Sequence, residues 1–299
     1  MPQQTVSWRA SAKINLALHV TARRPDGYHL IESLVVFTRF GDLLQATLAE
    51  TDGIVVSGRY ASTLPVDDHE NLITRARDAL RAPYAPQRPQ PVLLSLEKNL
   101  PVASGIGGGS SDAAATLRAL SQLWNLPVTE AELARIGLTL GADLPMCLAA
   151  QPLVARGIGD ELTVVGNFPA LGLVLVNPGV AVSTGEVFAN LASRENGALP
   201  ELPRVFDFHS LRNWLETTRN DLEPAARAIQ PVIGTALAAL DRAGSGFSRM
   251  SGSGATCFGL FETGNVAKRA AAAIRARHPD WFVAATRSLA SEDEVHDQD

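Results

Sequence analysis

Cysteine is nearly missing from this chain. Its 299 residues include only Cys147 and Cys257, which lie far apart in sequence and in apolar surroundings. A disulfide framework or a cysteine metal cluster would need more cysteines at closer spacing. We therefore expect two buried thiols in a reducing compartment, and no metal centre built on them.

Long apolar runs are also missing. No stretch approaches the roughly 18 apolar residues that a membrane-crossing helix needs; residues 170–176 form one of the longest, and they are typical of a buried strand. The first residues, MPQQTVSWRASAK, lack the apolar centre of a signal peptide. The sequence therefore predicts a cytoplasmic protein that does not act at a membrane.

Positive charge is scarce as well. There are 26 Lys and Arg against 31 Asp and Glu, which gives a net charge of −5, and no run of basic residues is present. Proteins that bind nucleic acid usually carry a basic surface, so we expect no nucleic-acid partner. Hydrophobic residues make up 46% of the chain, which is typical of a folded globular protein of one large or two ordinary domains.

A glycine-rich segment is the most informative feature that is present. Residues 100–115 read LPVASGIGGGSSDAAA, and the helical spacing of Ala113, Leu117, Leu120 and Trp124 follows at once. Glycines let backbone N–H groups approach a ligand, and the start of a helix carries unpaired N–H groups and partial positive charge. The segment therefore predicts a phosphate cradle. A glycine-rich turn with a serine as helix N-cap is the alternative.

The two commonest nucleotide motifs are not found. No GxxxxGK[ST] occurs, and a serine stands where GxGxxG would need its third glycine. A lysine and a carboxylate would have to come from elsewhere. Lys13 lies on a predicted strand at residues 12–20, on one face with Asn15, and Asp143 lies in the sequence GADLP. Lysines on apolar strands also extend to solvent, and such aspartates also form turns, so both alternatives stay open.

Hydrophobic spacing predicts alternating groups of strands and helices. In the first half, predicted strands cover residues 12–20, 31–40, 43–48, 54–56 and 92–97, and predicted helices cover residues 71–82 and 129–140, besides the helix after the glycines. In the second half, predicted strands cover residues 171–176, 255–261 and 281–286, and predicted helices cover residues 184–192, 208–217, 229–243 and 266–278. This order predicts an α+β fold.

Glycines and a charged turn at residues 157–168 indicate a domain boundary. We expect an ATP-binding N-terminal domain at residues 1–163, a C-terminal domain at residues 164–290, and a frayed acidic tail at residues 291–299. Asp143 is expected in a short non-helical segment before Pro145. Thr129 and Glu132 are expected to form a capping box, and Gly141 to end the same helix.

Three blocks resemble the GHMP kinase family, which includes galactokinase, homoserine kinase and mevalonate kinase. They are SAKINLALHV from Ser11, PVASGIGGGSSDAA from Pro101, and SGSGATCFGLF from Ser251. Within the family, four further motifs are similar to those of members whose acceptor carries a cytosine: RPDGYH at residues 24–29, LGADLP at 140–145, Ser-Thr at 183–184 and NDLE at 220–223. The resemblance implies a two-domain α+β GHMP kinase architecture with the active site in the inter-domain cleft.

The resemblance also implies cofactors, partners and residue roles. It implies an ATP- and Mg²⁺-dependent kinase, a monomer or homodimer, that phosphorylates a hydroxyl of a small cytidylated sugar alcohol. The implied catalytic residues are Lys13 and Asp143, and no residue is implied as a metal ligand. The implied ATP-binding residues are Asn71, Lys98, Pro101, Val102, Ala103, Ser104, Gly105, Ile106, Gly107, Gly108, Gly109, Ser110 and Ser111. The implied substrate-binding residues are Asn15, Tyr28, His29, Thr184 and Phe188.

Several alternatives remain open at this stage. Phe188 has the spacing of a core residue, Thr184 has that of a helix N-cap, and His29 alone is more typical of a hydrogen-bonded structural histidine than of a binding residue. The glycines at 251–254 can serve close approach to the first glycine segment, and Asp112 can favour the helix dipole or hold a hydrated Mg²⁺. Another GHMP kinase, for homoserine or a mevalonate derivative, and a non-catalytic nucleotide-binding module are the alternative functions.

Overall fold

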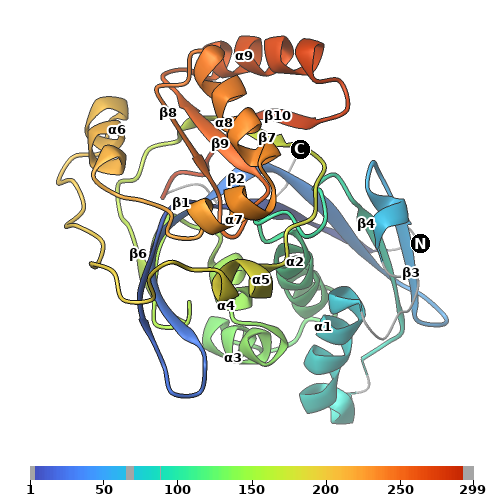
Figure 1. The fold of residues 1–299 in the computed structure, drawn as a ribbon. Helices are drawn as coiled ribbons and strands as arrows, with labels where there is room; N and C mark the ends of the chain where they lie inside the picture. Colours follow the sequence, from blue (N-terminus) through green and yellow to red (C-terminus); the bar gives the residue numbers. More distant parts are fainter. Residues whose placement is uncertain (1–3, 65–70, 88, 292–299) are drawn as a thin grey trace.

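The computed structural model describes residues 4–64, 71–87 and 89–291, and most of the predicted tail (292–299) lies outside these residues. Two sheets organise the chain (Figure 1). In the first sheet the order is β3–β4–β2–β5–β6, and β1 pairs with β2. Its strands are β1 (Thr5–Arg23), β2 (His29–Leu48), β3 (Gly53–Ser57), β4 (Val92–Glu97), β5 (Leu153–Arg156) and β6 (Glu161–Val164).

The long β1–β2 hairpin crosses the middle of the molecule. Its antiparallel register shifts in three places, and one shift falls between Ser11 and Lys13. Such irregularities bend a strand and turn its backbone groups away from the regular ladder. At this shift the backbone N–H of Lys13 donates to the carbonyl of Ile106, in the glycine segment, at 2.9 Å. The hairpin is thereby joined directly to that segment.

Helices cover one side of the first sheet, below the hairpin in Figure 1. Buried alanines such as Ala113 and Ala119 let α2 pack closely on β1. The predicted capping box of Thr129 and Glu132 is confirmed, as is the end of that helix at Gly141. These helices are α1 (Leu72–Arg81), α2 (Gly108–Leu123), α3 (Glu130–Leu140) and α4 (Leu144–Ala149), and two 3₁₀ turns lie at Ala61–Thr63 and Ala82–Gln87.

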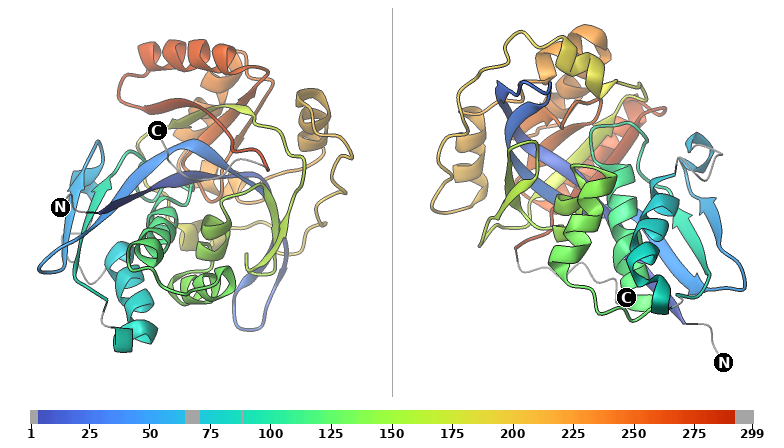
Figure 2. Two further views of the ribbon diagram at one scale, coloured as in Figure 1. Left: turned by 180° about the vertical axis from the view of Figure 1, so that it is seen from behind. Right: turned by 90° about the horizontal axis from the view of Figure 1, so that it is seen from below.

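The second sheet lies on the other side of the hairpin, as the views in Figure 2 show. Its order is β10–β7–β9–β8, and its strands pair antiparallel. The strands are β7 (Gly172–Asn177), β8 (Phe247–Met250), β9 (Cys257–Phe261) and β10 (Phe282–Arg287). The helices of this half are α5 (Thr184–Ala189), α6 (Phe208–Glu216), α7 (Glu223–Ile229), α8 (Val232–Arg242) and α9 (Gly264–Arg277).

The two halves share a core, and together they form the predicted two-domain α+β architecture. One cluster of buried side chains contains Ile14 of β1 together with Leu173 and Phe258 of the second sheet. Leu18 of β1 also forms a parallel bridge with Asn220, just before α7. The last strand of the first sheet ends at Val164 and the first strand of the second begins at Gly172, so we propose the domain limit in this connection.

Most predicted elements are confirmed, with three kinds of difference. Asp143 lies outside a helix, as expected, but the short helix α4 that follows it was not predicted; Pro145 stands in its first turn, where the missing N–H costs nothing. The helix predicted at 229–243 is α8, which begins later, at Val232, since Pro231 disfavours a helical residue before it, and the separate helix α7 was not predicted. The short strands β5, β6 and β8 were not predicted.

Both cysteines are free and buried, as predicted. In the described part of the chain, no helix combines the length and apolar character that a membrane span requires.

Candidate active site

Lys13 and Asp143 form an ion pair in a cavity that is lined by residues from both halves of the chain. Lys13 comes from β1 and Asp143 from the residue before α4, and Lys13 Nζ lies 2.5 Å from Asp143 Oδ2. The Lys13 residue is only 6% exposed, whereas 42% of the Asp143 side chain is exposed. The pair therefore presents its carboxylate, rather than its ammonium group, to the cavity.

The charge of Lys13 is fixed by this pairing. Burial alone would lower the pKa of Lys13, but the charge of Asp143 and its hydrogen bond raise that pKa above its usual value. Behind the pair, burial raises the pKa of the Cys147 thiol to about 12, so this group stays neutral. Lys13 is therefore a permanent positive charge beside the exposed carboxylate of Asp143.

The glycine segment forms the adjoining wall of the same cavity, which encloses about 520 Å³. Gly107 has a left-handed backbone (φ 66°) and caps α2, and a Cβ there would lie 3.1 Å from Cβ of Lys13. Glycine at this position thus lets the loop lie directly on the lysine. The wall consists of Ala103, Ser104, Gly105, Gly107, Gly108, Gly109 and Ser110.

The late glycine loop at residues 251–254 packs against this wall. Ser251 Oγ donates to the carbonyl of Gly105 at 3.1 Å, and Thr256 N donates to the carbonyl of Ser104 at 3.0 Å. This confirms the alternative that its glycines permit close approach to the first segment. Gly252 and Ser253 also line the cavity. The cavity is therefore closed from both halves of the chain.

Gly105→Ala is expected to destabilise the protein by about 1–3 kcal/mol, because Gly105 has φ +74° and its Cβ would lie 2.5 Å from the carbonyl oxygen of Ser251. Gly244→Ala is the matched control: Gly244 also has a positive φ (+84°), but no atom lies within 4 Å of the added Cβ. Urea unfolding compares the two. Equal losses of stability would show that the packing of the two loops contributes nothing.

Lys98 is not brought to the cavity. It is 1% exposed, and its Nζ is hydrogen-bonded to the carboxylates of Asp42 and, at 2.7 Å, Asp112. Burial alone would lower the pKa of Lys98, but the two carboxylates raise it. Asp42 Oδ1 also accepts the N–H groups of Asn99 (2.5 Å) and Leu100 (2.7 Å). Lys98 thus fastens the chain that leads into the glycine segment.

Asp112 also lies below the cavity rather than in it. Burial raises the pKa of its carboxyl well above the usual range, and the charge of Lys98 lowers it in part. Its Oδ1 is buried without a hydrogen-bond partner in the described part of the chain. Its other oxygen, Oδ2, accepts the hydrogen bond from Lys98, so Asp112 is the partner of Lys98.

Other predicted ATP-binding residues serve the fold with their side chains. Asn71 caps α1 by accepting the N–H of Ile73 at 3.0 Å, and Ser111 Oγ donates to the carbonyl of Ser11 at 2.7 Å. Ile106 is fully buried. Six of the predicted ATP-binding residues are not among those that line the cavity: Asn71, Lys98, Pro101, Val102, Ile106 and Ser111.

A second cavity of about 620 Å³ lies beside the first. Tyr28, His29 and Phe188 line it, and Phe188 lines the first cavity too. The rings of His29 and Phe188 are stacked with centroids 4.7 Å apart, while Tyr28 is 61% exposed. Burial lowers the pKa of His29, and the charges of Arg23 and Arg194 lower it further, so its ring is neutral at pH 7.

Two other predicted substrate residues line the first cavity. Asn15 is buried, donates through Nδ2 to Ser33 Oγ at 2.8 Å, and has no partner for its Oδ1 in the described chain. Thr184 Oγ1 lies 2.8 Å from Ser253 Oγ. The alternative of Thr184 as N-cap is wrong, since Ser183 caps α5. Phe188 is only partly buried, and α5 buries Val187 instead.

Sequence reasoning missed several lining residues. Arg23 precedes the RPDGYH motif and Ser253 lies in the SGSG motif, so both could have been found from them, whereas Arg194 carries no local signal. Asp42 was missed because a lone acid near the middle of a long strand resembles a surface residue. The fold alone brings it to Lys98, which lies 56 residues later.

Comparisons with known proteins agree with this geometry. The chain matches the family models of the GHMP kinases N terminal domain at residues 71–151 and the GHMP kinases C terminal domain at residues 198–280. A relative from Mesorhizobium japonicum, named 4-diphosphocytidyl-2-C-methyl-D-erythritol kinase, is 70% identical over 96% of this chain and 97% of its own. A protein of the same name from Rhizobium meliloti is 52% identical over 96% of this chain and 97% of its own.

Solved structures give the same result. A crystal structure of 4-(cytidine 5'-diphospho)-2C-methyl-D-erythritol kinase matches with a TM-score of 0.76 and 33% identity, over 95% of this chain and 99% of the other. Homoserine kinase from Cytophaga hutchinsonii matches with a TM-score of 0.69 at 16% identity, over 97% of this chain and 96% of the other. The second match shows a shared fold.

Proposed function

Because this chain belongs to the GHMP kinase family, among the 4-diphosphocytidyl-2-C-methyl-D-erythritol kinases, we propose that it phosphorylates the 2-hydroxyl of that cytidylated compound with ATP. This step belongs to the non-mevalonate route to isoprenoid precursors. The observation that carries the proposal is the Lys13–Asp143 pair beside the glycine wall, in a cavity that shares Phe188 with a second, aromatic cavity.

Asp143 is the group that acts on the acceptor hydroxyl. Its exposed carboxylate accepts the hydroxyl proton, or orients the hydroxyl, as the oxygen attacks the γ-phosphorus. Lys13 keeps this carboxylate ionised and stabilises negative charge that develops nearby. Phosphoryl transfer needs little covalent participation by the protein, so positioning and charge supply most of the effect.

The glycine wall holds the nucleotide. Its backbone N–H groups and the start of α2, a helix of 16 residues, suit the phosphates of ATP. The cavity also fits Mg²⁺, since the Ser110 hydroxyl that lines it is an oxygen ligand, and the phosphate oxygens of ATP would supply others. Mg²⁺ is commonly held by one or two protein oxygens together with phosphates, and it would neutralise phosphate charge there.

The second cavity holds the cytosine. The stacked rings of His29 and Phe188 leave no space for a base between them, so the base packs on the exposed ring of Tyr28 and against Phe188. The neutral imidazole of His29 has one donor and one acceptor, and its Nε2 has no partner in the described chain. Asn15 Oδ1 can accept a hydrogen bond from the sugar alcohol in the first cavity.

His29→Ala is expected to raise the KM for the cytidylated substrate about tenfold, because the base loses one hydrogen bond and the Phe188 ring loses the stacking contact that holds it in place. The affinity for ATP should stay the same, since His29 lines the second cavity and not the glycine wall. Steady-state kinetics with each substrate varied in turn measures both effects. An equal loss in the affinity for ATP would show that His29 does not belong to the cytosine site.

The experiment that tests the proposed function is ADP release with ATP and Mg²⁺. It compares 4-diphosphocytidyl-2-C-methyl-D-erythritol with homoserine and mevalonate. Turnover confined to the cytidylated compound is the expected result. Turnover with another acceptor would discard the cytosine pocket, and ATP binding without any turnover would favour a non-catalytic module.

A further inference from the structure

Two arginines face the second cavity without a carboxylate partner. Arg23 and Arg194 both line it, and neither forms an ion pair within the described part of the chain. Arg23 Nε donates to the carbonyl of Gly27 at 3.4 Å, and Arg194 Nη2 donates to the carbonyl of Ala189 at 3.5 Å. Hydrogen bonds of this length are weak. Both guanidinium groups therefore remain available for a ligand.

The acidic side chain at this cavity is already engaged. Asp26 lines the cavity, but its Oδ2 pairs with Arg24 at 2.7 Å and its Oδ1 accepts the N–H of Tyr28 at 3.2 Å. The charges of Arg23 and Arg194 still reach the ring of His29, where they lower its pKa after the larger effect of burial. The cavity thus combines aromatic surface with excess positive charge, which suits an anion attached to a flat ring.

The proposed substrate has such an anion. Its diphosphate links the cytosine, in the second cavity, to the sugar alcohol, in the first, so its negative charge must pass near Phe188. Lys13 cannot neutralise it, because Lys13 is already paired with Asp143. We propose that Arg194, assisted by Arg23, binds the diphosphate of the cytidylated substrate. This inference rests on the proposed function and extends it to a specific residue.

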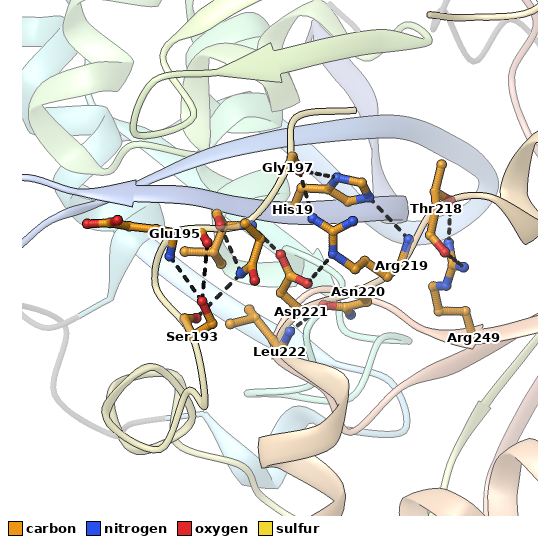
Figure 3. A network of polar contacts seen from close by, with 12 residues as sticks. His19, Ser193, Glu195, Gly197, Thr218, Arg219, Asn220, Asp221, Leu222 and Arg249 are labelled. Carbon is orange, nitrogen blue, oxygen red and sulfur yellow. Dashed lines mark hydrogen bonds and ion pairs between the residues drawn. The ribbon is translucent and has the colours of Figure 1, made fainter. Parts of the chain in front are cut away.

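The segment that carries Arg194 is fastened in place. We call residues 190–197 the strap. Both the N–H (3.1 Å) and the Nδ2 (3.0 Å) of Asn196 donate to the carbonyl of Val20 on β1. The carbonyl of Gly197 accepts two further hydrogen bonds, from His19 Nδ1 at 2.9 Å and from Arg219 Nη2 at 2.7 Å. Figure 3 shows both side chains directed at Gly197.

The network also fixes the groups that hold the strap. His19 Nε2 accepts the backbone N–H of Arg219 at 3.2 Å, so its Nδ1 carries the proton that it donates to Gly197. Asp221 joins Arg219 Nε (2.6 Å) to the N–H of Val20 (2.7 Å), as Figure 3 also shows for the ion pair. The strap is therefore anchored to the strand that also carries Lys13. Arg194 is held on a pre-organised support, which lowers the entropic cost of binding.

The test is the binding of cytidine and of cytidine diphosphate, measured by calorimetry with a saturating non-hydrolysable ATP analogue. The analogue keeps both probes out of the nucleotide site. Arg194→Ala is expected to weaken cytidine diphosphate about tenfold and to leave cytidine unchanged, since a charge-assisted contact to phosphate is lost. Arg194→Lys should restore part of the affinity. In turnover assays the alanine variant should raise the KM for the cytidylated substrate with little change in kcat.

Arg212→Ala is the matched control, because it removes the same charge from α6, where Arg212 pairs with Glu216 at 3.0 Å. It should bind both probes as the wild type does. Unchanged binding of cytidine diphosphate in Arg194→Ala would overturn the inference, and so would an equal loss for cytidine, which would place Arg194 at the base. If the wild-type protein bound neither probe and turned over no cytidylated substrate, the proposed function itself would be wrong.

Discussion

Asp143→Asn is expected to lower kcat by about two orders of magnitude or more, the scale of a general-base effect, and to leave the affinity for ATP nearly unchanged. The carboxylate is the exposed member of the Lys13–Asp143 pair, so it is the group that an acceptor hydroxyl can reach. Asparagine keeps the size and one acceptor oxygen but cannot take the proton. Pre-steady-state measurement of ADP formation would separate the chemical step from product release.

Asp143→Ala distinguishes the two roles of this carboxylate. If Asp143 mainly orients the hydroxyl, asparagine should keep most of the activity and alanine should lose it. If Asp143 takes the proton, both variants should be slow. Asp78→Asn, which alters a surface carboxylate of α1 hydrogen-bonded to Arg77, is the control and should behave as the wild type. Full turnover in both Asp143 variants would remove this residue from the mechanism.

The part of the site that was predicted from sequence is local. Four features were predicted, and each lies in a short motif whose conformation depends on its own residues: the glycine-rich wall, the start of the helix after it, Lys13 and Asp143. The face of β1 that carries Lys13 and Asn15 follows from strand alternation. Asp143 lies in the cavity as its motif indicated, because the position just before α4 presents the carboxylate there.

What was not predicted depends on distant partners. Lys98, two residues before Leu100, resembles a nucleotide-binding lysine, and only the fold brings it to Asp42 and Asp112. The short strand β5 pairs with β2 over Ser33–Val35, and a strand of this length is fixed by its neighbour rather than by its own composition. The strap carrying Arg194 has no periodic pattern, and its position follows from contacts to β1 and to residues 219–221.

The buried triad of Lys98, Asp42 and Asp112 leads to the second large expected effect. Lys98→Met should destabilise the protein by about 3–5 kcal/mol at pH 8, because two carboxylates that are almost fully buried would lose their cation. Methionine matches the length of lysine, so the loss reports charge rather than a cavity. Asp112→Asn should cost less, since it leaves Lys98 paired with Asp42.

The pH dependence of this variant gives a sharper test. Burial already raises the pKa of Asp112 well above its usual range, and loss of the Lys98 charge, which lowers it, would raise it further. The folded variant would then bind protons at pH values above 4 where the unfolded chain, with a carboxyl pKa near 3.9, binds almost none. Its stability relative to the wild type should therefore recover as the pH falls from 8 towards 5.

Urea unfolding at pH 8 and pH 5.5, together with titration of an ATP analogue, decides between two roles for Lys98. A large loss of stability that diminishes at the lower pH would identify Lys98 as the counter-ion of two buried acids. A variant that kept its stability at both pH values and lost only affinity for the analogue would instead place the ammonium group on the nucleotide. The first outcome is expected, because Lys98 Nζ already contacts two carboxylates below the glycine wall and lies outside the cavity that the wall lines.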